Sequence, residues 1–280
     1  MDKSFWNAIV ENDYAVPDGH TVEELTPELL TFLASSDIDV RDPFGYMIYA
    51  HWMVRDKHYS PEAIRKIRDQ LLGNLDKGLG EKDTDSVFLR SFSMLNLSLI
   101  VYYDLQDSFL TEDETNDLIN KSLDYFKQEK DLRGFVVGKG WAHSVAHTAD
   151  ILKFLARSSK SNKDNLQRIL DSISEKLLHP VETYVYVHSE DERLVMALMD
   201  ILKRDMLALN EWKDWIQQFI DWKNEEKQGD FQSEIHASWL NSKNLLRSFY
   251  FRLDLTDDLP VSAEAIKLQI FDAIKVFGQW

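Results

Sequence analysis

Two histidines and a carboxylate follow a pair of glycines near the middle of the chain. Their order is Gly138-Lys139-Gly140-Trp141, then His143, His147 and Asp150. In an α-helix of about 3.6 residues per turn, residues at i, i+4 and i+7 stack on one face. The apolar residues of the same stretch fall on the opposite face, toward the expected core. The spacing therefore predicts a helix that presents His143, His147 and Asp150 as one polar stripe.

This stripe could carry three kinds of chemistry. Two imidazoles at i and i+4 can bind one divalent metal ion, with Asp150 as a third ligand. Either histidine could instead act as an acid or base or contact a ligand directly, or both could make structural hydrogen bonds. The metalloprotease motif is excluded, because Ser144 and not Glu follows His143. The candidate catalytic residues are His143, His147, Asp150 and Glu190.

The glycine turn before the predicted helix is a candidate anion site. Free backbone N–H groups at a helix start, the positive end of the helix dipole and the ammonium of Lys139 all favour an anion. The glycine–lysine–hydroxyl spacing of a P-loop is missing. The alternative is that Gly138 and Gly140 only make a tight turn.

Helical periodicity dominates the rest of the chain, which contains only 10 Gly and 6 Pro. Candidate helix starts recur at intervals of about 50 residues, near Arg41, Arg90, His143, Arg193 and Asn241. A recurring helix pair is typical of an α-solenoid, in which each hairpin buries its apolar face against its neighbours. The pattern predicts an all-α, right-handed, HEAT-like array of about five antiparallel helical hairpins. The alternative is an irregular compact helical bundle.

The predicted array forms a single helical-repeat domain over residues 1–280. Residues 1–20 are expected to form an amino-terminal arm, and 258–280 a carboxy-terminal capping helix. Residues 184–187 alternate Tyr and Val as a strand does. No segment nearby offers a partner of similar character, so we expect a connector there.

In such an array the second helices of the pairs would line one wall, and equivalent residues would form a row across it. We expect this row to be a binding groove, whose arginines take a carboxylate or phosphate bidentately beside an aromatic wall. The expected ligand-binding residues are Arg41, Arg90, Lys139, Trp141, His143, His147 and Arg193, with Asp150 and Glu190 close by. The prediction is a binding or interaction module for an anionic small molecule or an acidic peptide.

Two alternatives use the same residues differently. In a hydrolase, His143 or His147 would act as general base, or both would hold a divalent metal with Asp150. Arg90 or Arg193 would then stabilise developing negative charge. In a structural role, the arginines would pair with neighbouring carboxylates and hold adjacent repeats together. The sequence itself requires no cofactor.

The composition argues against several functional classes of protein. The net charge of -16 argues against binding to a nucleic-acid backbone or to an anionic membrane surface. The absence of cysteine excludes disulfides and thiolate chemistry. The amino terminus lacks a signal-peptide pattern, and no apolar run is long enough to span a bilayer. We expect a soluble, cytoplasmic protein.

Several motifs together resemble one bacterial family. They are Arg41-Asp42, Arg90-Ser91-Phe92, Asp131-Leu132-Arg133-Gly134, Gly138-Lys139-Gly140-Trp141-Ala142-His143, His147, Asp150 and Glu190-Asp191-Glu192-Arg193-Leu194. In this order, roughly from Leu30 to Trp215, they resemble the family called domain of unknown function 2785. The resemblance implies a mostly helical, repeat-like bacterial domain and supports the choice of site residues. It implies no reaction.

Overall fold

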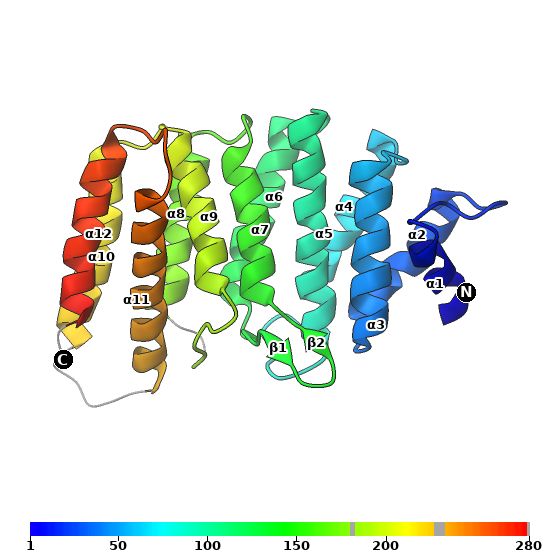
Figure 1. The fold of residues 1–280 in the computed structure, drawn as a ribbon, viewed down its shortest axis with the longest axis horizontal. Helices are drawn as coiled ribbons and strands as arrows, with labels where there is room; N and C mark the ends of the chain where they lie inside the picture. The colour runs from blue at the N-terminus through cyan, green and yellow to red at the C-terminus, as the bar shows by residue number, and fades with distance from the viewer. Residues whose placement is uncertain (180–182, 227–232, 279–280) are drawn as a thin grey trace. The chain divides into compact units, whose positions relative to one another are not determined.

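The computed structural model describes residues 1–179, 183–226 and 233–278, and nearly all of the regular structure in them is helical (Figure 1). The α-helices are α1 (Lys3–Glu11), α2 (Val22–Thr31), α3 (Ile38–Val40), α4 (Pro61–Asn74), α5 (Ser86–Gln106), α6 (Glu112–Gln128), α7 (Ser144–Arg157), α8 (Lys163–Leu178), α9 (Glu190–Lys203), α10 (Leu209–Glu226), α11 (Ser233–Asp254) and α12 (Ser262–Gly278). The prediction of an all-α fold is confirmed.

Three short helices of other types and one small hairpin complete the regular structure of the described residues. They are the 3-10 helix η1 (Phe32–Ala34), the π-helices η2 (Arg41–Ile48) and η3 (His51–Arg55), and the strands β1 (Phe135–Val136) and β2 (Gly140–Trp141). The strands are antiparallel, with Phe135 opposite Trp141 and Val136 opposite Gly140. This hairpin immediately precedes α7, the helix that carries the predicted polar stripe.

The helix starts follow from local capping. Thr21 and Glu24 form a reciprocal capping box at α2. Ser60 caps α4, with a proline at its first position. A second capping box precedes α6: the Thr111 N–H donates to the Glu114 carboxylate at 2.8 Å, and the Glu114 N–H donates to the Thr111 hydroxyl at 3.1 Å. These side chains satisfy N–H groups that a helix start leaves without partners, and for that reason the starts are readable from sequence.

The chain folds into two compact units. The first unit contains residues 1–110 and 129–151, and the second contains residues 111–128 and 152–280. The chain passes between the units before α6, after α6 and within α7. The predicted amino-terminal arm belongs to the first unit and contains α1, and the predicted capping helix begins at Ser262 as α12 of the second unit.

In the first unit, α5 packs against α4, η1, η2 and η3. Phe44, Trp52, Phe88 and Phe92 are at most 1% exposed and form part of its core. Among the described helices, α5 is the one with the length and apolar composition of a membrane span. In the most apolar window of α5, 78% is buried inside the protein. That burial is what the core helix of a soluble domain shows.

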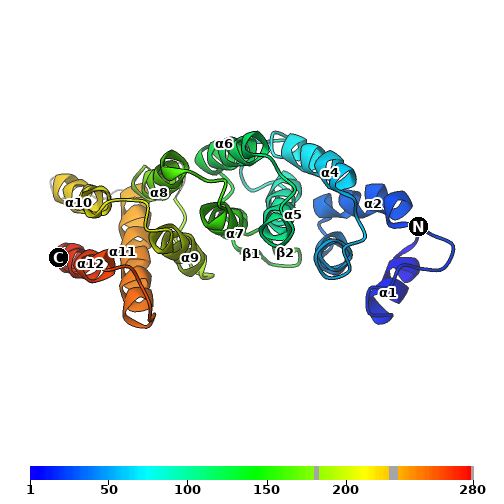
Figure 2. The ribbon, with the colours of Figure 1, turned by 90° about the horizontal axis from the view of Figure 1, so that it is seen from above.

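In the second unit, α8 packs against α6, α10, α9 and α11, while α11 packs against α9 and α12. Figure 2 shows α6, α8 and α10 in one row of this unit, with α9 and α11 in another. The helix α12 contacts both α10 and α11. Asn241 lies in the middle of α11 rather than near a helix start. The connector at 184–187 has neither helix nor strand structure.

Candidate functional site

The glycines before α7 make the turn of the β1–β2 hairpin. Gly138 and Gly140 both have φ +78°, a conformation that glycine adopts without strain. The backbone N–H of Lys139 donates to Val136 O at 3.0 Å, so the turn itself uses this donor. A Cβ on Gly140 would overlap the side chain of Ile38, 2.7 Å from Cγ1. The tight-turn alternative therefore describes this segment.

Arg41 fastens the hairpin to the helix segment that begins at α3. Its guanidinium is fully buried and donates to the carbonyl oxygens of Ser35, Lys139 and Trp141. The guanidinium carbon also lies 3.9 Å from the centre of the Phe88 ring. Burial lowers the pKa of Arg41 to about 10, which leaves it charged at neutral pH. These contacts match the structural alternative, with backbone carbonyls in place of the expected carboxylates.

Arg90 is equally enclosed, in a buried ion pair. Its Nε and Nη2 donate to the two carboxylate oxygens of Glu129 at 2.6 and 3.0 Å. Another nitrogen donates to Lys77 O at 3.0 Å and to Ser86 Oγ at 2.8 Å. Arg90 is 0% exposed and Glu129 1%. The pair holds the start of α5 to the segment that leads into the hairpin.

Two further cations at the hairpin are also paired within the first unit. Arg133 donates to both oxygens of the buried Asp131, at 2.8 and 2.6 Å, and this contact raises the pKa of Arg133. The half-exposed ammonium of Lys139 lies 2.6 Å from the carboxylate of Asp85. Lys139, with a side chain 42% exposed, is more exposed than Arg41, Arg90 or Arg133.

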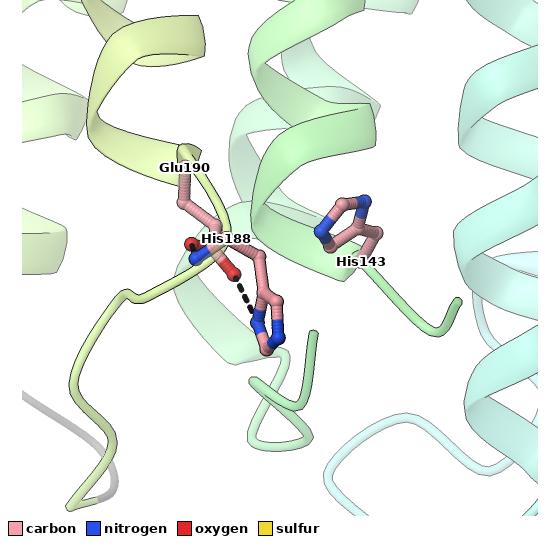
Figure 3. Close-up of side chains that lie close together, drawn as sticks. All are labelled: His143, His188 and Glu190. Atoms are coloured by element: carbon pink, nitrogen blue, oxygen red, sulfur yellow. Dashed lines mark hydrogen bonds and ion pairs between the residues drawn. The ribbon is translucent and has the colours of Figure 1, made fainter. Parts of the chain in front are cut away.

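His143 stands immediately before α7 and is held in an unusual backbone conformation. Its φ of +51° lies in the left-handed region, which costs free energy for any residue with a Cβ. Its backbone N–H donates to Arg133 O at 3.0 Å. Its ring stacks on Trp141, with ring centres 4.1 Å apart. The side chain is 6% exposed and is drawn in Figure 3.

His147 lies on the first turns of α7, with Nδ1 in hydrogen-bonding distance of Ser91. The hydroxyl of Ser91 donates its single proton to the carbonyl of Ala142. The same oxygen lies 2.8 Å from His147 Nδ1 and the carbonyl oxygen of Ser91 lies 3.2 Å from it, an arrangement that fits a proton on Nδ1 donated to Ser91. In the neutral ring Nε2 is then the acceptor nitrogen. This is the arrangement of an imidazole oriented to bind a metal or to accept a proton.

The two imidazoles lie near each other, but His143 precedes α7, so the predicted helical stripe contains only His147 and Asp150. Their ring centres are 5.9 Å apart and the rings are nearly perpendicular. Two imidazoles bound to one tetrahedral ion would have ring centres about 5 Å apart. Asp150 is half-buried one turn further along α7. The edge of His147 also contacts Phe92, with ring centres 5.1 Å apart.

Glu190 and Arg193 belong to the second unit, in the first turn of α9. Arg193 is half-buried and Glu190 is 1% exposed. One oxygen of Glu190 accepts from the backbone N–H of His188 at 2.7 Å. The other lies 3.8 Å from His188 Nδ1 (Figure 3). The single row of groove residues across all the repeats remains a prediction.

Three polar residues that contribute to these sites were missed as site residues. Ser91 orients His147, Glu129 neutralises Arg90, and His188 contacts Glu190. Only His188 carried a readable signal, since a histidine two residues before an acidic helix start can fold back onto it. Ser91 and Glu129 act on residues far away in the chain, so local spacing gives no hint of their partners.

Comparison with known proteins identifies a family and nothing more specific. No curated protein and no solved structure matches the chain. A family model described as protein of unknown function, DUF2785, matches residues 75–251, which include α5, the hairpin, α7 and the start of α9. Because this match covers well over half of the sequence, the chain belongs to the DUF2785 family.

Proposed function

We propose that this protein is a binding module whose ligand contacts the imidazole site, defined as Trp141, His143 and His147. The observation that carries the proposal is that both imidazoles are held in place before any ligand arrives. His143 is fixed by its backbone bond to Arg133 and by stacking on Trp141. His147 is fixed by Ser91. Preorganised polar side chains bind a ligand at a smaller entropic cost.

The expected ligand is anionic, either a small carboxylate or phosphate or an acidic peptide. Protonated imidazoles and Lys139 would supply the positive charge, and Trp141 an aromatic wall. Arg41 and Arg90 would stabilise the site without contacting the ligand, since both are fully buried. Arg41 donates to the hairpin carbonyl of Lys139, and Arg90 pairs with Glu129. The left-handed backbone at His143 supports a functional role, because strain of this kind is concentrated at binding and catalytic sites.

Calorimetric titration with inorganic phosphate, citrate and a hexaglutamate peptide, at pH 6 and pH 8, tests this proposal. We expect saturable binding of at least one probe, about tenfold tighter at pH 6, because an imidazole gains its charge between these values. H143Q and H147Q should lose the pH dependence, and W141F should retain most of the affinity. The matched control is H58Q, since His58 is an exposed histidine of the same unit.

Two results would contradict the binding proposal. One is the absence of saturable binding at pH 6 for every probe. The other is binding by H143Q and H147Q that is indistinguishable from the parent and from H58Q. Circular dichroism of each variant would first establish that it is folded.

The second candidate is a hydrolase, and the orientation of His147 favours it specifically. With Nδ1 donating to Ser91, Nε2 could act as a general base, or could bind a divalent metal together with His143 and Asp150. Elemental analysis by mass spectrometry on tag-free protein tests the metal form. Stoichiometric zinc, manganese or iron that is lost in H143A/H147A would support it. Protein that stays metal-free after incubation with these ions would contradict it.

A further inference from the structure

A second polar site lies in the second unit, where the predicted connector at 184–187 and its flanking residues meet α9; residues 183–189 are called the connector from here on. Glu190 is the first residue of α9 and is 1% exposed. Its Oε2 accepts the backbone N–H of His188 at 2.7 Å. Its Oε1 is buried and has no hydrogen-bond partner among the residues that the structure describes. Burying a carboxylate oxygen without a partner costs desolvation free energy, so a cation or a hydrogen-bond donor at this atom would be stabilising.

The ionisable side chain beside that oxygen in the second unit is the imidazole of His188. Its Nδ1 lies 3.8 Å from Glu190 Oε1 (Figure 3). A direct N–H···O hydrogen bond would need about 2.7 to 3.2 Å. Two ligand atoms each about 2.0 Å from a tetrahedral metal ion are separated by about 3.3 Å. The observed separation is thus too long for a hydrogen bond and about 0.5 Å longer than that of two ligands of one tetrahedral ion.

The connector is built so that it holds His188 in this position. The side chain of Asn241, on α11, donates to Tyr184 O and accepts from Tyr186 N, both at 2.8 Å. Ser189 takes a left-handed conformation, with φ +65°. Two fixed points therefore flank His188, although the connector has no regular structure of its own. Strain and side-chain support for irregular backbone are typical of a site that needs precise geometry.

The charge around Glu190 also favours a cation. Tyr186 is 4% exposed, and burial together with the charge of Glu190 raises the pKa of its hydroxyl. The negative charge of Glu190 therefore acts on a buried neighbour instead of being dispersed in water. A bound cation would neutralise this charge where it lies.

We propose that His188 Nδ1 and Glu190 Oε1 bind a divalent transition-metal ion in the second unit, with water completing the coordination. One imidazole nitrogen and one carboxylate oxygen suit zinc, manganese or cobalt, and the chain has no cysteine that would favour a thiolate site. The proposal uses no residue of the imidazole site, so either can fail without the other.

The test uses the full chain, without a histidine tag, stripped with a chelator and dialysed. Zinc is titrated by calorimetry, and cobalt by its visible absorption, which reports the ligand type and geometry. We expect the parent to bind one ion whose affinity depends on His188 and Glu190. H188A and E190Q should each lower that affinity at least about tenfold. Zinc should also raise the Tm of the parent but not of E190Q.

E190Q is the sharpest variant, because its amide oxygen can still accept the N–H of His188 and so preserve the fold. The control is H179A, which removes an exposed histidine of the same unit. Parent protein that binds neither metal would overturn the proposal. Binding by H188A and E190Q with the affinity of the parent would overturn it as well.

Discussion

At the scale of single residues, the most consequential contacts of the first unit are buried charges. Arg90 and Glu129 are both removed from water, and their two parallel bonds compensate for the lost hydration. Exposed ion pairs of the same unit have no such cost to compensate. Lys3 and Asp37, for example, are 3.0 Å apart with side chains 47% and 49% exposed.

We predict that E129Q lowers the free energy of unfolding by about 3 kcal/mol, because it leaves the Arg90 charge buried without a counter-charge. Denaturant unfolding, followed by far-ultraviolet circular dichroism, measures the change. K3A, which breaks the exposed pair, should cost much less than E129Q. If the two variants lost equal free energy of unfolding, burial would not determine how much the Arg90–Glu129 pair stabilises the fold.

At the scale of elements, the β1–β2 hairpin is the part that positions the imidazole site. Its Gly138 and Gly140 share a φ of +78°, but their surroundings differ. A Cβ at Gly138 would meet nothing within 4 Å, whereas one at Gly140 would overlap Cδ1 and Cγ1 of Ile38. Alanine at Gly138 therefore tests the cost of the backbone conformation alone, and alanine at Gly140 adds the cost of steric overlap.

We predict that G138A costs about 1 kcal/mol, for the left-handed backbone alone. G140A should cost about 2 kcal/mol more, because the added methyl overlaps Ile38. Thermal and denaturant unfolding of both variants measure the difference. The double variant I38A/G140A should recover part of the loss, since it removes the overlapping atoms. The absence of any coupling between these two positions would contradict the close packing of the hairpin on α3.

At the scale of the whole chain, the excess of negative charge is the dominant electrostatic feature. The 48 acidic residues outnumber the 32 Lys and Arg, and two of those cations, Arg41 and Arg90, are fully buried. Exposed ion pairs contribute little to stability, while like charges repel over the whole surface. The folded chain therefore carries a repulsion that mobile ions can screen.

We predict that raising sodium chloride from about 20 mM to about 300 mM at pH 8 increases the Tm by a few degrees, as the screening length falls. Differential scanning calorimetry across a salt series measures this shift. A Tm that falls with salt would show that specific ion pairs outweigh the net repulsion. An uncharged osmolyte at equal osmolality serves as the control for general solvent effects.

Local features of the structure were predictable from sequence. The helix starts at Thr21, Ser60 and Thr111 follow from side chains within one turn of the N–H groups they satisfy. His143 and His147 lie near each other because only four positions separate them, although His143 precedes α7 in a left-handed conformation and is not part of the predicted helix. Family membership was visible in the same motifs, and the family model confirms it.

The sequence by itself thus determined the all-α class, several helix starts and the His143–His147 pair, because each depends on residues within a few positions of one another. Only the tertiary structure decided that Arg41 and Arg90, both predicted as groove residues, are fully buried, the first on backbone carbonyls and the second on Glu129. Arg41 binds backbone carbonyls about a hundred positions away along the chain. Every residue type offers a carbonyl, so such a partner leaves no trace in the sequence, and only the folded path of the backbone can supply it.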